Sequence, residues 1–321
     1  MVGTPFQRAL VIRGGALGDF LLTLPVLQSL REAAPSSRVE LLAYPGLGAL
    51  AKNAGMVDEV RSIEYGPMAG FFTRGAVLDP ALREYFGSFD LIVSYLYDPD
   101  GIFRENLRGS GAQRVVIGPH RPGAGAHAID QLAAPLADLG LPLCGRAGRI
   151  GAARVEHDVP TVAIHPGSGS AAKNWPVENW RQLVQRLLAE SSDIHVAVIG
   201  GEADAPVLAA LRDLAVQERV VFWENLDLAD LAGRLAGAQL YLGHDTGISH
   251  LAAAAGAPSL LLFGPTDPGV WSPPHDHVRV LRAPEGRLEN LAVNTVAAAV
   301  RPLVPGRRLA TGDATPDNAA P

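Results

Sequence analysis

Short apolar segments alternate with longer amphipathic segments along most of this chain, and this alternation limits its fold more than any other feature. In the N-terminal half, strand-like segments occur at ALVIR (9–13), RVELLAY (38–44), EVRSIEY, FDLIVSYL and RVVIG (114–118). In the C-terminal half they occur at TVAIHPG, HVAVIGG, RVVFWE, LYLGHD and PSLLLFG. Short strands joined through helical segments predict parallel βαβ units. The sequence therefore predicts an α/β protein with two Rossmann-like, parallel-sheet domains facing each other across a cleft.

A Gly/Arg-rich segment, GRAGRIGAARVEHDVP, ends in Pro160 and is typical of an interdomain link. We accordingly predict an N-terminal domain over residues 1–155 and a C-terminal domain over 156–305. Residues 306–321 are polar and rich in Pro and Ala, which predicts a disordered tail. Within the first helical pattern, LGDFLLTLPVLQSLREAAP, Pro25 predicts a bend or a restart of the helix.

The composition excludes several classes of protein. With 48% hydrophobic and 19% charged residues, the chain has a globular composition. Its one cysteine, Cys144, excludes a disulfide framework and a cysteine-based metal cluster, and indicates a reducing compartment. No segment reaches the roughly 20 apolar residues of a membrane span, and the N-terminus does not resemble a secretory signal. A cytoplasmic protein is expected.

The charge is unevenly distributed between the two halves. The net charge of −6 argues against general nucleic-acid binding. Residues 1–155 carry 15 basic and 14 acidic side chains, whereas residues 156–321 carry 12 and 19. The nearly neutral, arginine-rich N-terminal half is compatible with an anionic partner, although chance drift explains the same numbers. Only Lys52 and Lys173 are lysines, which makes the position of each more informative.

Loops that follow the strands are the places to look for a site, because ligands of open parallel sheets bind beyond the carboxyl ends of strands. The first such loop, RGGALGDF, places Asp19 near the start of a helix. Asp19 is either a carboxylate favoured by the helix dipole or a general base that stays ionised at neutral pH. The glycine spacing does not match a dinucleotide fingerprint.

Two further loops lie in the C-terminal half. The segment IHPGSGSAAKNWPVENW contains small residues that free backbone N–H groups for an anion, and Lys173 adds a positive charge. A flexible loop with a solvated lysine explains the same residues. In VIGGEADAP, Glu202 follows a strand and is suited to accept hydrogen bonds from a ribose, unless it is simply an acidic residue at a helix start.

The fourth loop, in LYLGHDTGISHLAAAAG, joins a strand to a helix through a polar tetrapeptide. Asp245 or Thr246 is expected to cap the helix that begins near Gly247. The free N–H groups at that helix start form an anion site, and His250, one turn later, can point toward the same ligand or pack as an ordinary histidine.

Three other interpretations of these residues are weaker. Asp-Thr-Gly is the tripeptide of aspartic proteases, but their chemistry needs two carboxylates and no second copy occurs. Asp98-Pro99-Asp100 resembles a D-x-D metal site, but a turn explains these residues better. His244, His250, His275 and His277 include no i, i+4 pair of the kind used to bind zinc on a helix.

Taken together, the loops resemble glycosyltransferase family 9, the ADP-heptose:lipopolysaccharide heptosyltransferases. ALVIRGGALGDFLLTLPVLQSLREAAP is similar to the opening strand, Gly-Asp turn and first helix of that family. IHPGSGSAAKNWPVENW resembles its H-P-G…K-x-W-P segment, and GHDTGISHLAAAAGAPSLLLFGPTDP resembles its most recognisable signature. The resemblance covers roughly residues 8 to 303 and implies a GT-B fold, with the acceptor bound by the N-terminal domain and the nucleotide-sugar by the C-terminal domain.

The resemblance also implies a reaction and a set of roles. The reaction would be an inverting transfer that needs neither metal nor cofactor. The donor would be a nucleotide-diphosphate sugar, most of all ADP-heptose, and the acceptor a lipopolysaccharide-core or other glycan, either anionic or lipid-linked. Transient contact of the protein with the inner face of a membrane would follow. Asp19 would be the catalytic base, with Gly18 and Arg13 on the acceptor side. On the donor side the resemblance implies diphosphate contacts from Ser168 and Lys173, a ribose contact from Glu202, a base contact from Leu226, sugar contacts from Asp245, and phosphate contacts from Thr246, Gly247 and His250.

Three alternatives remain open from the sequence. One is a glycosyltransferase of the same fold with another sugar nucleotide and an acceptor other than lipopolysaccharide. The second is a nucleotide-binding module without turnover, and the third is a dinucleotide-dependent oxidoreductase, suggested by the Gly-rich turns between strands and helices.

Overall fold

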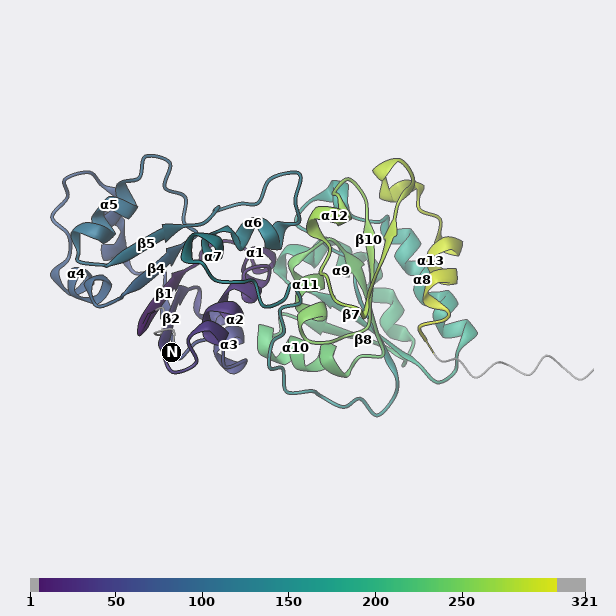
Figure 1. Ribbon diagram of the computed structural model, residues 1–321. Helices are drawn as coiled ribbons and strands as arrows, with labels where there is room; N and C mark the ends of the chain where they lie inside the picture. Colours follow the sequence, from purple (N-terminus) through teal and green to yellow (C-terminus); the bar gives the residue numbers. More distant parts are fainter. Residues whose placement is uncertain (1–5, 305–321) are drawn as a thin grey trace, which may run out of the picture.

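Two parallel sheets, one in each half of the chain, form separate lobes in the computed structural model, which describes residues 6–304 (Figure 1). The N-terminal sheet has the strand order β3-β2-β1-β4-β5, and the C-terminal sheet has the order β11-β10-β9-β6-β7-β8. The strands of the first sheet are β1 (Arg8–Ile12), β2 (Arg38–Ala43), β3 (Glu59–Ser62), β4 (Leu91–Ser94) and β5 (Arg114–Ile117). Those of the second are β6 (Thr161–His165), β7 (His195–Gly200), β8 (Val220–Glu224), β9 (Leu240–His244), β10 (Ser259–Phe263) and β11 (Val278–Arg282).

Helices connect and cover the strands of both sheets, as the alternating pattern predicts. In the N-terminal half they are α1 (Leu17–Leu21), α2 (Leu24–Ala33), α3 (Pro45–Asn53), η1 (Gly66–Phe72), α4 (Pro80–Gly87), α5 (Ile102–Gly109), α6 (Ala128–Leu132) and α7 (Ala134–Leu139). In the C-terminal half they are η2 (Ala171–Lys173), α8 (Val177–Glu190), η3 (Glu202–Asp204), α9 (Ala205–Leu211), η4 (Arg212–Val216), α10 (Leu228–Gly237), α11 (Gly247–Ala254), α12 (Pro268–Trp271), η5 (Pro284–Gly286), η6 (Leu288–Asn290) and α13 (Val293–Val300).

The ten strands expected from the sequence all form. Most are buried apolar runs, whereas β3 and β8 at the sheet edges are only partly buried. Strand β11 was not among the expected strands. Its sequence, VRVLR, mixes apolar and basic residues, and it lies at the edge of the sheet with partly or fully exposed side chains. Pro25 restarts the first helix: α1 ends at Leu21, and Pro25 occupies the first turn of α2, where a missing N–H group costs nothing.

The two domains touch along several elements. Helix α1 packs against α11, and α3 packs against α10. At the first contact a side chain on Gly247 would lie 3.0 Å from the backbone nitrogen of Gly18, so the pair of glycines allows the two helix starts to meet. The linking residues 141–160 contain no helix or strand, and the Ile150 N–H within them donates to the Ala254 carbonyl at 3.0 Å. The predicted tail, 306–321, lies outside the described residues.

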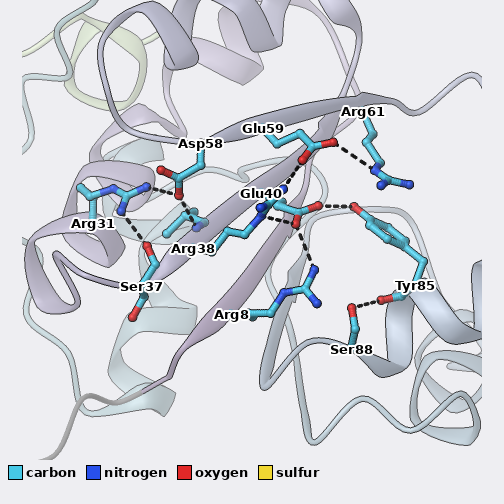
Figure 2. Close-up of polar contacts among 11 residues, drawn as sticks. Arg8, Arg31, Ser37, Arg38, Glu40, Asp58, Glu59, Arg61, Tyr85 and Ser88 are labelled. Atoms are coloured by element: carbon cyan, nitrogen blue, oxygen red, sulfur yellow. Dashed lines mark hydrogen bonds and ion pairs between the residues drawn. The ribbon is translucent and has the colours of Figure 1, made fainter.

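A buried carboxylate, that of Glu40, is hydrogen-bonded to side chains from several elements of the N-terminal domain (Figure 2). Glu40 on β2 is 1% exposed, and it accepts hydrogen bonds from Arg8 at 3.1 Å, Arg38 at 2.8 Å and the Tyr85 hydroxyl at 3.2 Å. The Arg61 guanidinium stacks over the Tyr85 ring at 4.2 Å. A buried charge needs such partners to offset the loss of hydration. This network fixes β1, β2 and α4 relative to one another, away from the cleft.

None of the helices within residues 6–304 combines the length and the apolar character that crossing a bilayer requires.

Candidate functional site

A cleft of about 740 Å³ lies between the domains, where the starts of α1 and α11 meet. Both domains contribute to its wall, and the contributions come from loops at the carboxyl ends of β1, β5, β6, β7, β9 and β10. This is the position in which open parallel sheets bind ligands. The residues that line the cleft are Ala16, Leu17, Gly18, Asp19, Leu22, Arg121, His165, Ser168, Gly169, Ser170, Lys173, Ala203, Asp204, Asp245, Thr246, Gly247, Ile248, His250, Thr266 and Trp271.

Asp19 lies on the N-terminal side of this cleft, in the first turn of α1, with its side chain 30% exposed. Its backbone carbonyl accepts hydrogen bonds from Arg13 at 3.0 Å and from the Thr23 hydroxyl at 2.9 Å. Two donors on one carbonyl hold the turn in place, so the Asp19 carboxylate is presented to the cleft from a rigid element.

Arg13 does not reach the cleft, although we expected it on the acceptor side. Its side chain is 1% exposed and lies beneath Asp19, with its guanidinium 3.9 Å from the Asp19 carboxylate. It also donates to the His120 carbonyl at 3.0 Å. Burial lowers the pKa of Arg13, while the negative charge of Asp19 opposes that shift. Arg13 therefore holds the loop that carries Asp19 in place, because a buried guanidinium needs hydrogen-bond acceptors and finds them in nearby backbone carbonyls.

Across the cleft, Lys173 and Asp245 form an ion pair with 2.8 Å between the Lys173 Nζ and a carboxylate oxygen. Lys173 comes from η2 after β6, and Asp245 follows β9. Ser168 also lines the cleft, where its hydroxyl donates to the Ser170 carbonyl at 2.7 Å and so closes the small loop before Lys173. The structure thus brings together three residues that the sequence analysis selected from two separate loops.

The start of α11 faces the same space. Thr246 is the N-cap residue, and its hydroxyl accepts a hydrogen bond from the Ser249 N–H at 3.3 Å. Within residues 6–304, the N–H groups of Gly247 and Ile248 have no hydrogen-bond acceptor. Such groups, reinforced by the helix dipole, attract an anion. The helix cap expected at Asp245 or Thr246 is therefore made by Thr246, and it coexists with a free anion site.

His250 lies one turn into α11, is 7% exposed and lines the cleft. Burial lowers the pKa of His250 to about 4, against the opposing effect of the Asp245 carboxylate. The ring is therefore neutral near pH 7 and can act as a hydrogen-bond donor or acceptor rather than as a cation. Gly18 lies next to it: a side chain at Gly18 would approach the His250 ring to 3.6 Å.

Two residues expected on the donor side lie elsewhere. Glu202 lines a neighbouring hollow of about 500 Å³, together with Arg212, Glu224 and Asn225, rather than the cleft. Leu226 is partly buried against the apolar core and lines neither space. The carboxylate of this turn that does face the cleft is that of Asp204, two residues after Glu202. A sequence cannot distinguish two acidic residues in one short turn, since the 3-10 turn η3 decides which one points inward.

His165 is a second residue that the sequence analysis did not single out. It is the last residue of β6, is 4% exposed, and contacts both Asp204 and Thr246. A histidine directly before the Pro-Gly of IHPGSGS was the only available signal.

Other polar residues have structural roles. His244 is fully buried, and its Nε2 accepts the Trp175 N–H at 2.9 Å. Burial lowers the pKa of His244 to about 3, so the ring is neutral. Asp98 accepts hydrogen bonds from the Phe103 and Arg104 N–H groups at the start of α5, which confirms the turn interpretation of Asp98-Pro99-Asp100.

Comparison with known proteins agrees with this architecture. The family model for glycosyltransferase family 9 (heptosyltransferase) matches residues 130–299. Lipopolysaccharide heptosyltransferase 1 of Pseudomonas aeruginosa is 26% identical over 298 residues, covering 82% of this chain and 80% of that protein. The corresponding protein of an Escherichia coli strain is 37% identical over 124 residues, which is 39% of this chain and 37% of that protein.

Two solved structures share the fold. A family 9 glycosyl transferase from Veillonella parvula has a TM-score of 0.76 at 18% identity, covering 92% of this chain and 97% of that one. E. coli heptosyltransferase WaaC with ADP has a TM-score of 0.73 at 22% identity, covering 92% and 100%. These similarities confirm the GT-B fold and do not favour an oxidoreductase. The chain belongs to glycosyltransferase family 9, the heptosyltransferase family, and is a glycosyltransferase that uses a nucleotide-sugar.

Proposed function

We propose that the protein transfers heptose from ADP-heptose to a glycan acceptor of the lipopolysaccharide core, with inversion at the anomeric carbon and without a metal ion. The observation that carries this proposal is the opposition, across one cleft, of Asp19 to the start of α11 and the pair Lys173–Asp245. The names of the relatives support the acceptor class. Solved neighbours contain ADP or ADP-2-deoxy-2-fluoro heptose, which supports the donor.

The donor diphosphate would lie against the free N–H groups at the start of α11, with Lys173 beside it. As the bond between the sugar and the diphosphate breaks, its electron pair moves to a phosphate oxygen and negative charge grows there. Fixed N–H donors and one ammonium group stabilise this charge without reorganisation, which lowers the barrier. The neutral ring of His250 offers one more donor. This set supplies the positive potential that the proposed metal-independent reaction needs.

Asp19 would act from the opposite side of the sugar. Its carboxylate takes the proton of the acceptor hydroxyl while the hydroxyl oxygen forms a bond to the anomeric carbon. Attack on the face opposite the departing ADP inverts the configuration, and the proton then passes from Asp19 to water. The sugar is oxocarbenium-like in such a transition state, so Asp245 can hold its hydroxyls in position. A lipid-linked acceptor would place the reaction at a membrane surface, on the cytoplasmic side.

The replacement Asp19→Asn tests the proposed base. An amide of the same shape cannot take the proton, so we expect kcat to fall about a hundredfold or more, while ADP affinity stays near that of the wild type. Released ADP, measured with a donor panel and a lipid-linked acceptor, gives the rate. A variant that keeps the wild-type kcat would remove Asp19 as the base, and turnover with UDP- or GDP-sugars instead would reassign the donor.

A further inference from the structure

Three loops at the carboxyl edge of the C-terminal sheet are joined by one chain of side chains. His165 ends β6, Asp204 ends η3 after β7, and Thr246 caps α11 after β9. The His165 Nε2 lies 3.3 Å from an Asp204 carboxylate oxygen, and its Nδ1 lies 3.5 Å from the Thr246 hydroxyl. All three residues line the cleft, so the chain is part of the wall to which the proposed donor binds.

In this chain of hydrogen bonds, each donor and each acceptor can be assigned from the protonation of the side chains. Burial raises the pKa of Asp204, but the bonds from His165 and from the Gly201 N–H outweigh that effect and leave the pKa lowered. Asp204 is therefore an ionised acceptor, and the His165 Nε2 carries the proton that it receives. With the proton of the ring on Nε2, the Nδ1 is free to accept a hydrogen bond, and the Thr246 hydroxyl is the donor that faces it.

This arrangement leaves the lone pairs of the Thr246 oxygen for the helix cap. They accept the Ser249 N–H at 3.3 Å, which fixes the first turn of α11. The unpaired N–H groups of Gly247 and Ile248 are then held toward the cleft before any ligand arrives. Donors that are already in place bind a developing charge better than donors that must first be ordered.

We infer that His165 is a positioning residue of the donor site: oriented by Asp204, it orients the Thr246 hydroxyl and thereby the anion-binding start of α11. The effect of His165 on catalysis rests on the proposed function, since the start of α11 is the proposed diphosphate site. The order that it imposes on α11 does not depend on which donor binds.

The first test therefore needs no donor. Hydrogen exchange of the ligand-free, full-length protein is followed in peptides that cover residues 246–254. His165→Ala and Asp204→Ala should each accelerate exchange there by about tenfold, the loss expected when a buried hydrogen bond is removed. Asp204→Asn should stay within about twofold of the wild type, because the amide oxygen still accepts both hydrogen bonds. His195→Ala, at the opposite end of the sheet, is the matched control.

The second test uses ADP as the probe in calorimetric titration and then measures kcat and KM. His165→Ala and Asp204→Ala should each raise the ADP dissociation constant about tenfold, and the double variant should be no worse than either single variant. Asp204→Asn distinguishes a role in orienting His165 from a role of the negative charge. If Asp204 orients His165, this variant should bind ADP nearly as tightly as the wild type; if only its charge matters, the variant should bind ADP as weakly as Asp204→Ala.

Unchanged exchange in residues 246–254, or additive losses in the double variant, would overturn the role of His165. If His165→Ala fails to fold, Asp204→Ala, at a partly buried position of the short turn η3, is used for both measurements. Failure of the wild type to bind ADP, with the exchange pattern as expected, would refute the proposed donor and leave the positioning role standing.

Discussion

Lys173 and Asp245 neutralise each other across two loops, and the proposed diphosphate would compete for the same ammonium group. Lys173→Ala should raise the dissociation constant of ADP about tenfold to a hundredfold, the value of a hydrogen bond to a charged group. Lys52→Ala, which removes the other lysine from an exposed position on α3, is the control. Calorimetric titration with ADP measures the dissociation constants of both variants. Equal ADP affinities of the two variants would exclude Lys173 from the diphosphate site.

His244 gives stability a dependence on pH. Its pKa is about 3 in the folded protein, because the ring is buried, against an ordinary value near 6.5. Between these values the unfolded chain binds a proton that the folded protein does not. The contribution of His244 to the free energy of unfolding is therefore complete above pH 6.5 and falls by about 1.4 kcal/mol per pH unit below it.

Urea titrations between pH 7 and pH 4 test this dependence. The wild type should lose stability more steeply over this range than His244→Gln, which keeps an acceptor for the Trp175 N–H but cannot be protonated. His250, with a pKa of about 4, contributes to both proteins and cancels in the comparison. Parallel curves for the two proteins would contradict the assignment.

Helices α1 and α11 belong to different domains and meet at their first turns, where Gly18 and Gly247 are in contact. A methyl group on Gly247 would lie 3.0 Å from both the Gly18 nitrogen and the Leu17 Cβ, so the backbone at this contact would have to shift by a few tenths of an ångström. Since the Asp19 carboxylate and the proposed diphosphate site face each other here, Gly247→Ala should lower kcat/KM about tenfold or more.

Steady-state kinetics of Gly247→Ala are compared with those of Gly46→Ala. Gly46 is also in the first turn of a helix, α3, and a side chain there meets nothing within 4 Å. The substitution Gly46→Ala should therefore leave kcat/KM unchanged and stabilise the protein slightly. Wild-type kinetics for Gly247→Ala would mean that the contact is not needed for catalysis.

At the scale of the whole molecule, the apolar core is shared between the domains. One continuous buried cluster includes Leu47 and Leu50 of α3 and Leu231 and Leu235 of α10. Backbone bonds of the linking segment and the His127 contact with the Ser272 carbonyl at 2.9 Å add further ties. Domains that share a core in this way should unfold together.

The tryptophans allow this expectation to be measured directly. All four of them, Trp175, Trp180, Trp223 and Trp271, lie in the C-terminal half, and the three other than Trp271 lie away from the cleft, so their fluorescence reports mainly that domain. Far-UV circular dichroism reports both domains. We expect the two signals to give the same midpoint in urea, and separate midpoints would show that the domains unfold independently.

Much of this fold could be predicted from the sequence, because buried parallel strands occur in it as short apolar runs between helical segments. Strand β1 differs from the expected segment 9–13 by one residue at each end, and β5 starts at Arg114 as expected. Strand β11 was missed because its exposed edge position leaves no continuous apolar run. That Asp19, Lys173 and Asp245 line one cleft could also be expected, since each follows a strand in a loop of small residues; their catalytic and binding roles stay predictions.

The sequence by itself determined the βαβ rhythm, the two parallel sheets and the loops at their carboxyl ends, because these depend on local periodicity and on turn residues. Only the tertiary structure decided that Asp204 rather than Glu202 faces the cleft, that Arg13 is buried beneath Asp19, and that His165 connects Asp204 to Thr246. These facts depend on the distance between side chains from different loops, which packing sets and no single segment encodes.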